Sequence, residues 1–200
     1  MEKDFWQSKY KEDHTPWDIG QVAPAFVKYN SKLRAQNSKV CVLGCGRGHD
    51  AFYFAEKGFE TYGFDFAKSA VDYCNKIKKR KKLKSVYFYQ KDFFKLTKDK
   101  RWSGFFDCVI EHTSFCAINP KRREEYVGLI NYLLKPGGKL IGLFFSRPKK
   151  LGGPPYGINK SKLRALLNKG FKEIEKLHPE KCLHGNTLNG EEYFGVFEKR

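Results

Sequence analysis

Short runs of apolar, β-branched and aromatic residues alternate with helical patterns along the middle of the chain. Five such runs predict strands, at residues 39–43, 60–64, 86–89, 106–111 and 139–145. Apolar residues at three- and four-residue spacing predict helices at 50–57, 67–80 and 160–169, and one more that begins at Asn119-Pro120 and ends at Pro136-Gly137-Gly138. Two closing strands, 171–177 and 193–197, are expected to be antiparallel neighbours because no helix-length pattern lies between them.

This alternation predicts an α/β protein. We expect a single Rossmann-like, doubly wound sheet of about seven strands, mostly parallel with an antiparallel closing strand, and helices on both faces. No internal repeat or low-complexity linker divides the sequence, so residues 1–200 are expected to form one domain. In such sheets a ligand binds beyond the carboxyl ends of the strands, where the strand order reverses.

The composition argues against several classes of protein. Hydrophobic residues make up 40% and aromatic residues 16% of the chain, which indicates a packed core. No apolar stretch approaches the roughly 18 residues of a membrane span, and the charged N-terminus lacks the apolar core of a signal peptide. The six cysteines form no C-x-x-C pair, so neither a disulfide framework nor a metal site is expected. We therefore expect a cytoplasmic protein with reduced thiols.

Three glycines, Gly44, Gly46 and Gly48, follow the first predicted strand in the stretch VLGCGRGHD. A G-x-G-x-x-G dinucleotide turn would place a further glycine where this chain has His49, so the pattern differs from that motif. Glycines at this density cost conformational entropy, which indicates a sharp turn or a ligand close to the backbone. We interpret the stretch as a ligand-binding turn and His49 as a residue of that turn.

Two acidic residues end the next two predicted strands. Asp65 ends the second strand, and a carboxylate there can accept two hydrogen bonds from a ribose diol; alternatively it caps the helix that starts at Ala67. Asp92 and Phe93 end the third strand, where an acid beside an aromatic ring suits adenine; the alternative is an ordinary loop carboxylate. Together with the glycine turn, these residues predict an adenosine site.

Four segments carry a resemblance to a known family: FWQSKYKEDHTPWDIG (5–20), VLGCGRGHD (42–50), FDCVIEHTSFCAINP (106–120) and GGPPYGI (152–158). The chain resembles the class I S-adenosylmethionine-dependent methyltransferases. It is most similar to the thiopurine S-methyltransferase family, which also contains thiol and halide methyltransferases. Many methyltransferases share the glycine motif, whereas TPWDIG and the pair FCAINP and GGPPY are far more specific.

The resemblance implies an N-terminal segment, residues 1–30, that closes over the cofactor S-adenosylmethionine with three aromatic residues. These are Trp6, Tyr10 and Trp17, of which Tyr10 departs from a position that is often tryptophan in thiol and halide methyltransferases. Aromatic faces attract cations such as the sulfonium of the cofactor, and a closed lid excludes water. The alternative is that the tryptophans only pack the N-terminal helix onto the core.

Further cofactor contacts are implied at the strand ends. By the resemblance, Gly44 meets the methionine part of the cofactor, Asp65 the ribose, and Asp92 and Phe93 the adenine. His112 matches a position that is tyrosine or arginine in relatives, which implies contact but no fixed chemical role.

The methyl acceptor implied by the resemblance is a small soft nucleophile, above all a thiol, with a halide as another candidate and S-adenosylhomocysteine as the product. Arg123 matches a family arginine near the substrate pocket, although a solvated helix arginine is the alternative. Pro154, Pro155 and Tyr156 are expected to form a rigid pocket wall. No catalytic base is assigned, because a few per cent of a thiol is already thiolate at pH 7. Glu111 could serve as one, but binding the cofactor's amino group or ordering the following loop is the favoured role.

The net charge of +17 raises nucleic acid as a partner. The stretch KIKKRKKLK, residues 76–84, could make this chain an RNA methyltransferase or a nucleic-acid-binding protein. We favour a solvated helix end, because the helix dipole favours cations there and no N-P-P-Y-type loop follows the fourth strand. A catalytically inactive cofactor-binding protein is a second alternative. We therefore expect a monomer that acts on small molecules, with no nucleic-acid or membrane partner.

Overall fold

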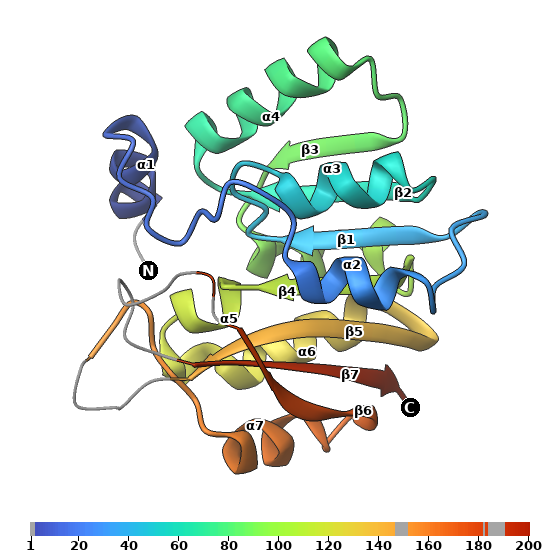
Figure 1. The fold of residues 1–200 in the computed structure, drawn as a ribbon. Helices are drawn as coiled ribbons and strands as arrows, with labels where there is room; N and C mark the ends of the chain where they lie inside the picture. The colour runs from blue at the N-terminus through green and yellow to red at the C-terminus, as the bar shows by residue number, and fades with distance from the viewer. Residues whose placement is uncertain (1–2, 147–151, 182, 184–190) are drawn as a thin grey trace.

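The computed structural model describes residues 3–146, 152–181, 183 and 191–200. Its centre is one seven-stranded sheet in the order β3-β2-β1-β4-β5-β7-β6 (Figure 1). The strands are β1 (Lys39–Leu43), β2 (Glu60–Asp65), β3 (Val86–Gln90), β4 (Phe106–His112), β5 (Leu134–Ser146), β6 (Phe171–Glu180) and β7 (Glu191–Lys199). The pairs among β1 to β5 are parallel, whereas β7 is antiparallel to both β5 and β6. The predicted fold class, with its antiparallel closing strand, is confirmed.

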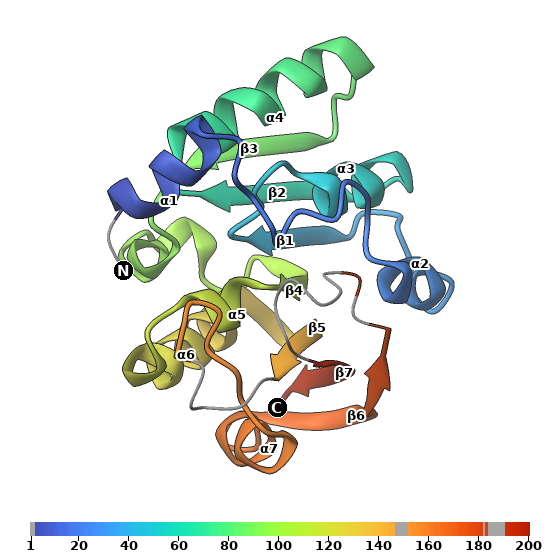
Figure 2. The same cartoon turned by 60° about the vertical axis from the view of Figure 1, so that its left-hand side comes forward.

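Helices cover both faces of this sheet (Figures 1 and 2). The α-helices are α1 (Lys3–Lys11), α2 (Pro24–Asn30), α3 (His49–Glu56), α4 (Lys68–Lys81), α5 (Ser114–Ala117), α6 (Arg123–Leu133) and α7 (Lys160–Leu167). Three short 3₁₀ helices are η1 (Phe93–Lys98), η2 (Lys100–Trp102) and η3 (Pro120–Arg122). No helix in the described part of the chain is long and apolar enough to cross a membrane.

Side-chain alternation along the strands builds two apolar cores, one on each face. In β1, Val40 and Val42 belong to the core under α2, α3 and α4, while Cys41 and Leu43 belong to the core under α5, α6 and α7. All four side chains are buried. Because both faces are covered, a central parallel strand must be apolar at every position, which is why the run 39–43 was recognisable in the sequence.

The N-terminal segment contains two helices with different surroundings. α1 packs against α4 and lies beyond the carboxyl ends of β1 and β2 (Figure 2). α2 instead buries Ala25, Phe26 and Tyr29, and its Phe26 packs against Phe54 of α3 and Phe194 of β7. Residues 3–11 therefore lie over the end of the sheet, whereas residues 24–30 are part of its core.

Some element boundaries differ from those predicted from the sequence. β5 begins at Leu134 and not at residue 139, because Leu134 already pairs with Phe106 of β4. The predicted helix after Asn119 begins as η3, with the Asn119 side chain accepting a hydrogen bond from Lys121 N, and continues as α6 to Leu133. The short elements η1, η2 and α5 were not predicted.

Candidate active site

The glycine turn that follows β1 has a left-handed backbone at all three glycines. The φ angles are +60° at Gly44, +51° at Gly46 and +78° at Gly48. A Cβ atom on Gly44 would collide with the hydroxyl of Ser114, and one on Gly46 would lie 2.8 Å from the hydroxyl of Tyr10. Side chains from α5 and from α1 therefore lie directly on this turn, and only glycine permits both approaches.

Asp65 connects the end of β2 to this turn. Its Oδ2 accepts a hydrogen bond from Gly46 N at 2.9 Å, and its Oδ1 accepts one from Ala67 N at 2.9 Å. Burial raises the pKa of Asp65 to about 6, because it disfavours the charged form, while the backbone N–H donors act in the opposite direction. The carboxyl group thus binds the backbone at the start of α4, as the helix-cap alternative predicted. Asp65 also lines the cavity under the lid, where the contact with a ribose remains a prediction.

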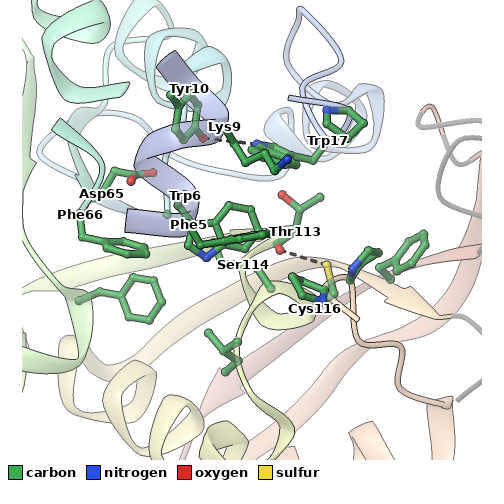
Figure 3. Close-up of a pocket in the computed structure, with 18 of the residues that line it drawn as sticks. Phe5, Trp6, Lys9, Tyr10, Trp17, Asp65, Phe66, Thr113, Ser114 and Cys116 are labelled. Carbon is green, nitrogen blue, oxygen red and sulfur yellow. Dashed lines mark hydrogen bonds between the residues drawn. The ribbon is translucent and has the colours of Figure 1, made fainter. Parts of the chain in front are cut away.

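The three predicted lid aromatics lie against one another. The ring centroids of Trp6 and Trp17 are 4.9 Å apart, and those of Tyr10 and Trp17 are 5.9 Å apart. Trp17 Nε1 donates a hydrogen bond to the Tyr10 hydroxyl at 3.3 Å, as Figure 3 shows. These contacts join the three lid side chains to one another, and the same three side chains line the cavity beneath them.

Ion pairs tie this lid to the glycine turn. Arg47, which lies between Gly46 and Gly48, pairs with Asp13 and, through Nε at 3.4 Å, with Asp18. His49 Nε2 lies 2.9 Å from the other carboxylate oxygen of Asp18. Arg47 and His49 thus connect the glycine turn to the lid, a role that the sequence analysis did not assign to them.

A cavity of about 230 Å³ lies between the lid and the strand ends (Figure 3). It brings together most of the predicted site: Trp6, Tyr10, Trp17, Gly44, Asp65, Phe93 and Pro155. The lid side adds Lys9 and His14, and the opposite wall adds Cys116, none of which was predicted. Lys9 follows Trp6 by one helical turn, so the helical spacing of the lid could have identified it.

Asp92 lines a second cavity of about 390 Å³. Phe66 and Phe93 line both cavities and therefore form the boundary between them. Asp92 is the N-cap of η1, where its Oδ1 accepts a hydrogen bond from Phe94 N at 3.1 Å. Asp92 and Phe93, the acid and the aromatic ring predicted to frame adenine, thus line one cavity, and Phe93 also lines the cavity that contains Asp65.

His112 lies behind the glycine turn. Its Nδ1 lies 2.9 Å from Asp50 Oδ2, and its ring packs edge-on against Phe26. Burial disfavours the charged imidazole, but the Asp50 carboxylate outweighs this effect and raises the pKa of His112 above its usual value. His112 lines a small cavity of about 60 Å³ that it shares with Gly44, and the larger cavity under the lid does not include it. Its predicted contact with the cofactor remains a prediction.

Arg123 holds the loop that carries the two prolines. Its Nη2 donates hydrogen bonds to the carbonyl oxygens of Tyr156 at 2.5 Å and Gly157 at 3.4 Å, and its guanidinium lies 4.8 Å from the centroid of the Phe115 ring. Burial lowers the pKa of Arg123. Arg123 therefore lies behind the pocket wall, and neither it nor Tyr156 lines the cavity under the lid, whereas Pro154 and Pro155 do.

Glu111 orders the loop between β4 and α5. Its Oε1 accepts a hydrogen bond from Phe115 N at 2.7 Å, and its Oε2 accepts one from the hydroxyl of Tyr126. The side chain is fully buried, and this burial raises the pKa of Glu111 to about 7. Of the roles considered for Glu111, loop ordering is the one that these contacts support.

The basic segment 76–84 covers the C-terminal half of α4. Lys81 Nζ forms an ion pair with Glu56 Oε1 at 2.6 Å, and Lys78 Nζ lies 4.8 Å from the ring centroid of Tyr87. These two lysines thus bind side chains of α3 and β3, as expected for a solvated helix face.

Comparison with known sequences identifies the family. A sequence model described as thiopurine S-methyltransferase matches residues 1–199. The chain belongs to the thiopurine S-methyltransferase family. A "Probable thiol methyltransferase 2" of Arabidopsis thaliana is 32% identical over 196 residues, covering 97% of this chain and 84% of that protein. The "Thiocyanate methyltransferase 1" of the same plant is 29% identical, covering 100% of this chain and 86% of that protein.

Solved structures agree with the fold of this family. The 1,6-didemethyltoxoflavin-N1-methyltransferase of Burkholderia thailandensis, solved with S-adenosylhomocysteine bound, aligns with a TM-score of 0.79 at 18% identity, covering 98% of this chain and 86% of that one. With the family membership, the chain is an S-adenosylmethionine-dependent methyltransferase, as predicted. Neither Arabidopsis relative is named for a nucleic-acid substrate.

Proposed function

We propose that this methyltransferase transfers a methyl group to a small soft nucleophile, a thiol first and a halide or similar anion second. The observation that carries the proposal is the cavity in which the aromatic lid, the glycine turn and Asp65 meet a wall made by Pro154 and Pro155. The sequence relatives named for thiol and thiocyanate acceptors support it. We also propose that residues 1–200 act as one domain, because one sheet with helices on both faces contains all of the described strands, and that the protein acts as a monomer.

The residues present fit S-adenosylmethionine. The indole N–H of Trp6 is buried and, within the described part of the chain, has no hydrogen-bond acceptor, so a ligand in the cavity would supply one. Gly44 itself lines the cavity, so the backbone of the turn is within reach of a bound ligand. In the proposed arrangement Gly44 contacts the methionine part, Asp65 the ribose, and Asp92 and Phe93 the adenine.

The proposed mechanism rests on positioning. When bound, S-adenosylmethionine supplies a methyl group on a cationic sulfonium. The faces of Trp6, Tyr10 and Trp17 stabilise a cation by about 0.5–2 kcal/mol each when desolvated. Closure of α1 over the strand ends excludes water, and the rigid Pro154-Pro155 wall holds the acceptor within reach, so that attack and departure lie in line.

Deprotonation of the acceptor needs no dedicated side chain in this proposal. A thiol with a pKa near 8.5 is a few per cent ionised at pH 7, and a halide carries no proton at all. Glu111 is fully engaged with Phe115 N and Tyr126, and it does not line the cavity under the lid. We therefore assign it to the loop and leave proton transfer to solvent.

A methyl-transfer assay with S-adenosylmethionine tests the proposal, with formation of S-adenosylhomocysteine as the readout. The acceptors are bisulfide, small alkyl and aromatic thiols, a thiopurine, thiocyanate, iodide and bulk RNA. Turnover of thiols or small anions without turnover of RNA is expected. Turnover of RNA alone would overturn the proposal and would make the basic segment 76–84 the candidate substrate track.

A further inference from the structure

We propose that Lys9 is a specificity-determining residue that selects negatively charged acceptors at the mouth of the cavity; this inference rests on the proposed function. Lys9 lies on α1, one turn after Trp6, and lines the cavity under the lid beside Tyr10 and Trp17 (Figure 3). The side chain is half-buried, and its ammonium lies 5.7 Å from the ring centroid of Phe5, another lining residue.

The charge of Lys9 is not neutralised by the rest of the lid. The lid carboxylates Asp13 and Asp18 pair with Arg47 and His49, and no ion pair joins Lys9 to Asp4, Glu12 or any other carboxylate among the described residues. Apart from Asp65, the other side chains around the cavity are aromatic, aliphatic or uncharged, with His14 at the edge. In such apolar surroundings a single cation acts over a longer distance than it would in water.

His14 reinforces this position through the backbone. Its N–H donates a hydrogen bond to the carbonyl oxygen of Lys9 at 3.0 Å, so the chain turns back after α1, and both basic side chains line the same cavity. Cys116 lies across the cavity from Lys9 (Figure 3), and Pro154 and Pro155 also line this cavity. An acceptor bound between these walls lies in the same cavity as the side chain of Lys9.

Lys9 lines the same cavity as Gly44 and Asp65, which are proposed to contact the cofactor, so acceptor and cofactor meet within one cavity. The carboxyl group of Asp65 is directed at the backbone N–H groups of Gly46 and Ala67, on the ribose side. The basic residues nearest the glycine turn are Arg47 and His49, which line the small neighbouring cavity with Gly44. Lys9 does not line that small cavity, and its side chain lies in the cavity under the lid, where the acceptor binds in the proposed function.

An anion that enters an apolar cavity loses its hydration, and this loss opposes binding unless a nearby positive charge offsets it. Lys9 supplies that charge to a thiolate, bisulfide, thiocyanate or halide and gives no such advantage to an uncharged acceptor. Its effect should therefore appear in the KM of anionic acceptors. The rate of the methyl-transfer step and the affinity for the cofactor should change little.

The test compares steady-state kinetics of the full chain with its Lys9→Met, Lys9→Arg and Lys9→Glu variants, using bisulfide, thiocyanate and iodide. For the anion that the unaltered protein uses best, Lys9→Met should raise KM about five- to ten-fold, and Lys9→Glu should raise it further. Lys9→Arg should keep KM within about two-fold. Lys11→Met is the matched control, because Lys11 is exposed on the same helix and lines neither cavity, and it should leave KM unchanged.

Calorimetry of S-adenosylhomocysteine binding completes the test, and its Kd should be the same for all variants. An unchanged KM in Lys9→Met would overturn the inference, as would a Kd that rises in parallel with KM, which would place Lys9 on the cofactor. Turnover of thiols with no turnover of any of the three anions would overturn the inference and leave the proposed function standing. Absence of turnover on every small acceptor would overturn both.

Discussion

The guanidinium of Arg47 and the carboxylate of Asp18 join the glycine turn to the lid, with Nε 3.4 Å from Oδ2. Asp18 is nine-tenths buried at its side chain and is also bound by His49 and by Gly20 N, so the pair belongs to a network. These contacts lower the pKa of Asp18 against the opposing effect of burial. The turn that contacts the cofactor in our proposal thus also holds the lid in its closed position.

Arg47→Met should weaken cofactor binding through the lid. Without the guanidinium, Asp13 and Asp18 lose their partner in the turn, and the closed arrangement of α1 becomes less favourable. We expect the Kd for S-adenosylhomocysteine to rise about three- to ten-fold, in line with one partly buried ion-pair network. Calorimetry measures this Kd. Arg101→Met is the control, because Arg101 in η2 forms a similar ion pair with Asp99. An unchanged Kd would show that the ion pairs between Arg47 and the lid have no effect on cofactor binding.

Gly44→Ala should impair both stability and cofactor binding. The new methyl group would collide with Ser114, and the φ of +60° disfavours any side chain. We expect a loss of about 1–3 kcal/mol in the free energy of unfolding and at least a ten-fold weaker cofactor affinity. Denaturant unfolding and calorimetry measure the two effects. Gly137→Ala is the control, because Gly137 has a similar φ of +72° but open space where a methyl group would lie. A larger loss of stability in Gly44→Ala than in Gly137→Ala therefore reports the clash with Ser114.

Glu111 should make the stability of the fold depend on pH. The pKa of Glu111 is about 7 in the folded protein and near its usual 4.5 in the unfolded chain. Between these values the folded protein holds a proton that the unfolded chain releases, so the free energy of unfolding falls as the pH rises from 4.5 to 7. The contribution is on the order of 3 kcal/mol, fully present below pH 4.5 and lost above pH 7.

The isosteric variant Glu111→Gln should remove this dependence. Urea unfolding at a series of pH values should show similar stability near pH 4.5 and a more stable variant near pH 8. Glu125→Gln on α6 is the control, because Glu125 is exposed, its pKa is lowered by Arg122, and its removal should leave the slope unchanged. A wild-type slope that persists in Glu111→Gln would contradict the assignment. A smaller slope from Asp65, with its pKa of about 6, should remain below pH 6 in both variants.

Arg123→Met should affect the acceptor more than the cofactor. The guanidinium binds the carbonyl oxygens of Tyr156 and Gly157, so its loss frees the segment that follows the Pro154-Pro155 wall. We expect KM for a thiol to rise about three- to ten-fold through lost wall positioning, while the Kd for S-adenosylhomocysteine stays within two-fold. Lys121→Met, at an exposed position in η3, should change neither value. Equal losses in both values would instead indicate a general disturbance of α6.

The sequence was sufficient to predict the sheet because its central strands are apolar on both faces. The run 39–43 becomes β1 with Val40 and Cys41 buried on opposite sides, and the glycine turn follows where the strand pattern places it. The positions of Gly44, Asp65 and Asp92 at the ends of successive strands could also be predicted, since the carboxyl ends of parallel strands lie at the same edge of the sheet.

Side-chain direction could not be predicted in the same way. Whether His112 faces the cavity or Asp50 depends on where α3 lies against β4, which no local pattern records. The direction of the Arg123 side chain could not be predicted either, because its hydrogen-bond partners are carbonyl groups more than thirty residues away in the chain. The short helices η1 and α5 were also not predicted, since they have only one or two turns; η1 is capped by the side chain of Asp92.

The last strand in the chain occupies an interior place in the sheet. β7 lies between β5 and β6 and pairs with both, and its Val196 and Phe197 are fully buried. During synthesis β5 and β6 therefore leave the ribosome before β7, the strand that pairs with both of them. The sheet can close only after β7 has emerged, so joining β5 to β6 waits for a strand that is translated after both. Until then β5 exposes an unpaired edge, a point at which chaperones or aggregation can act on the nascent protein.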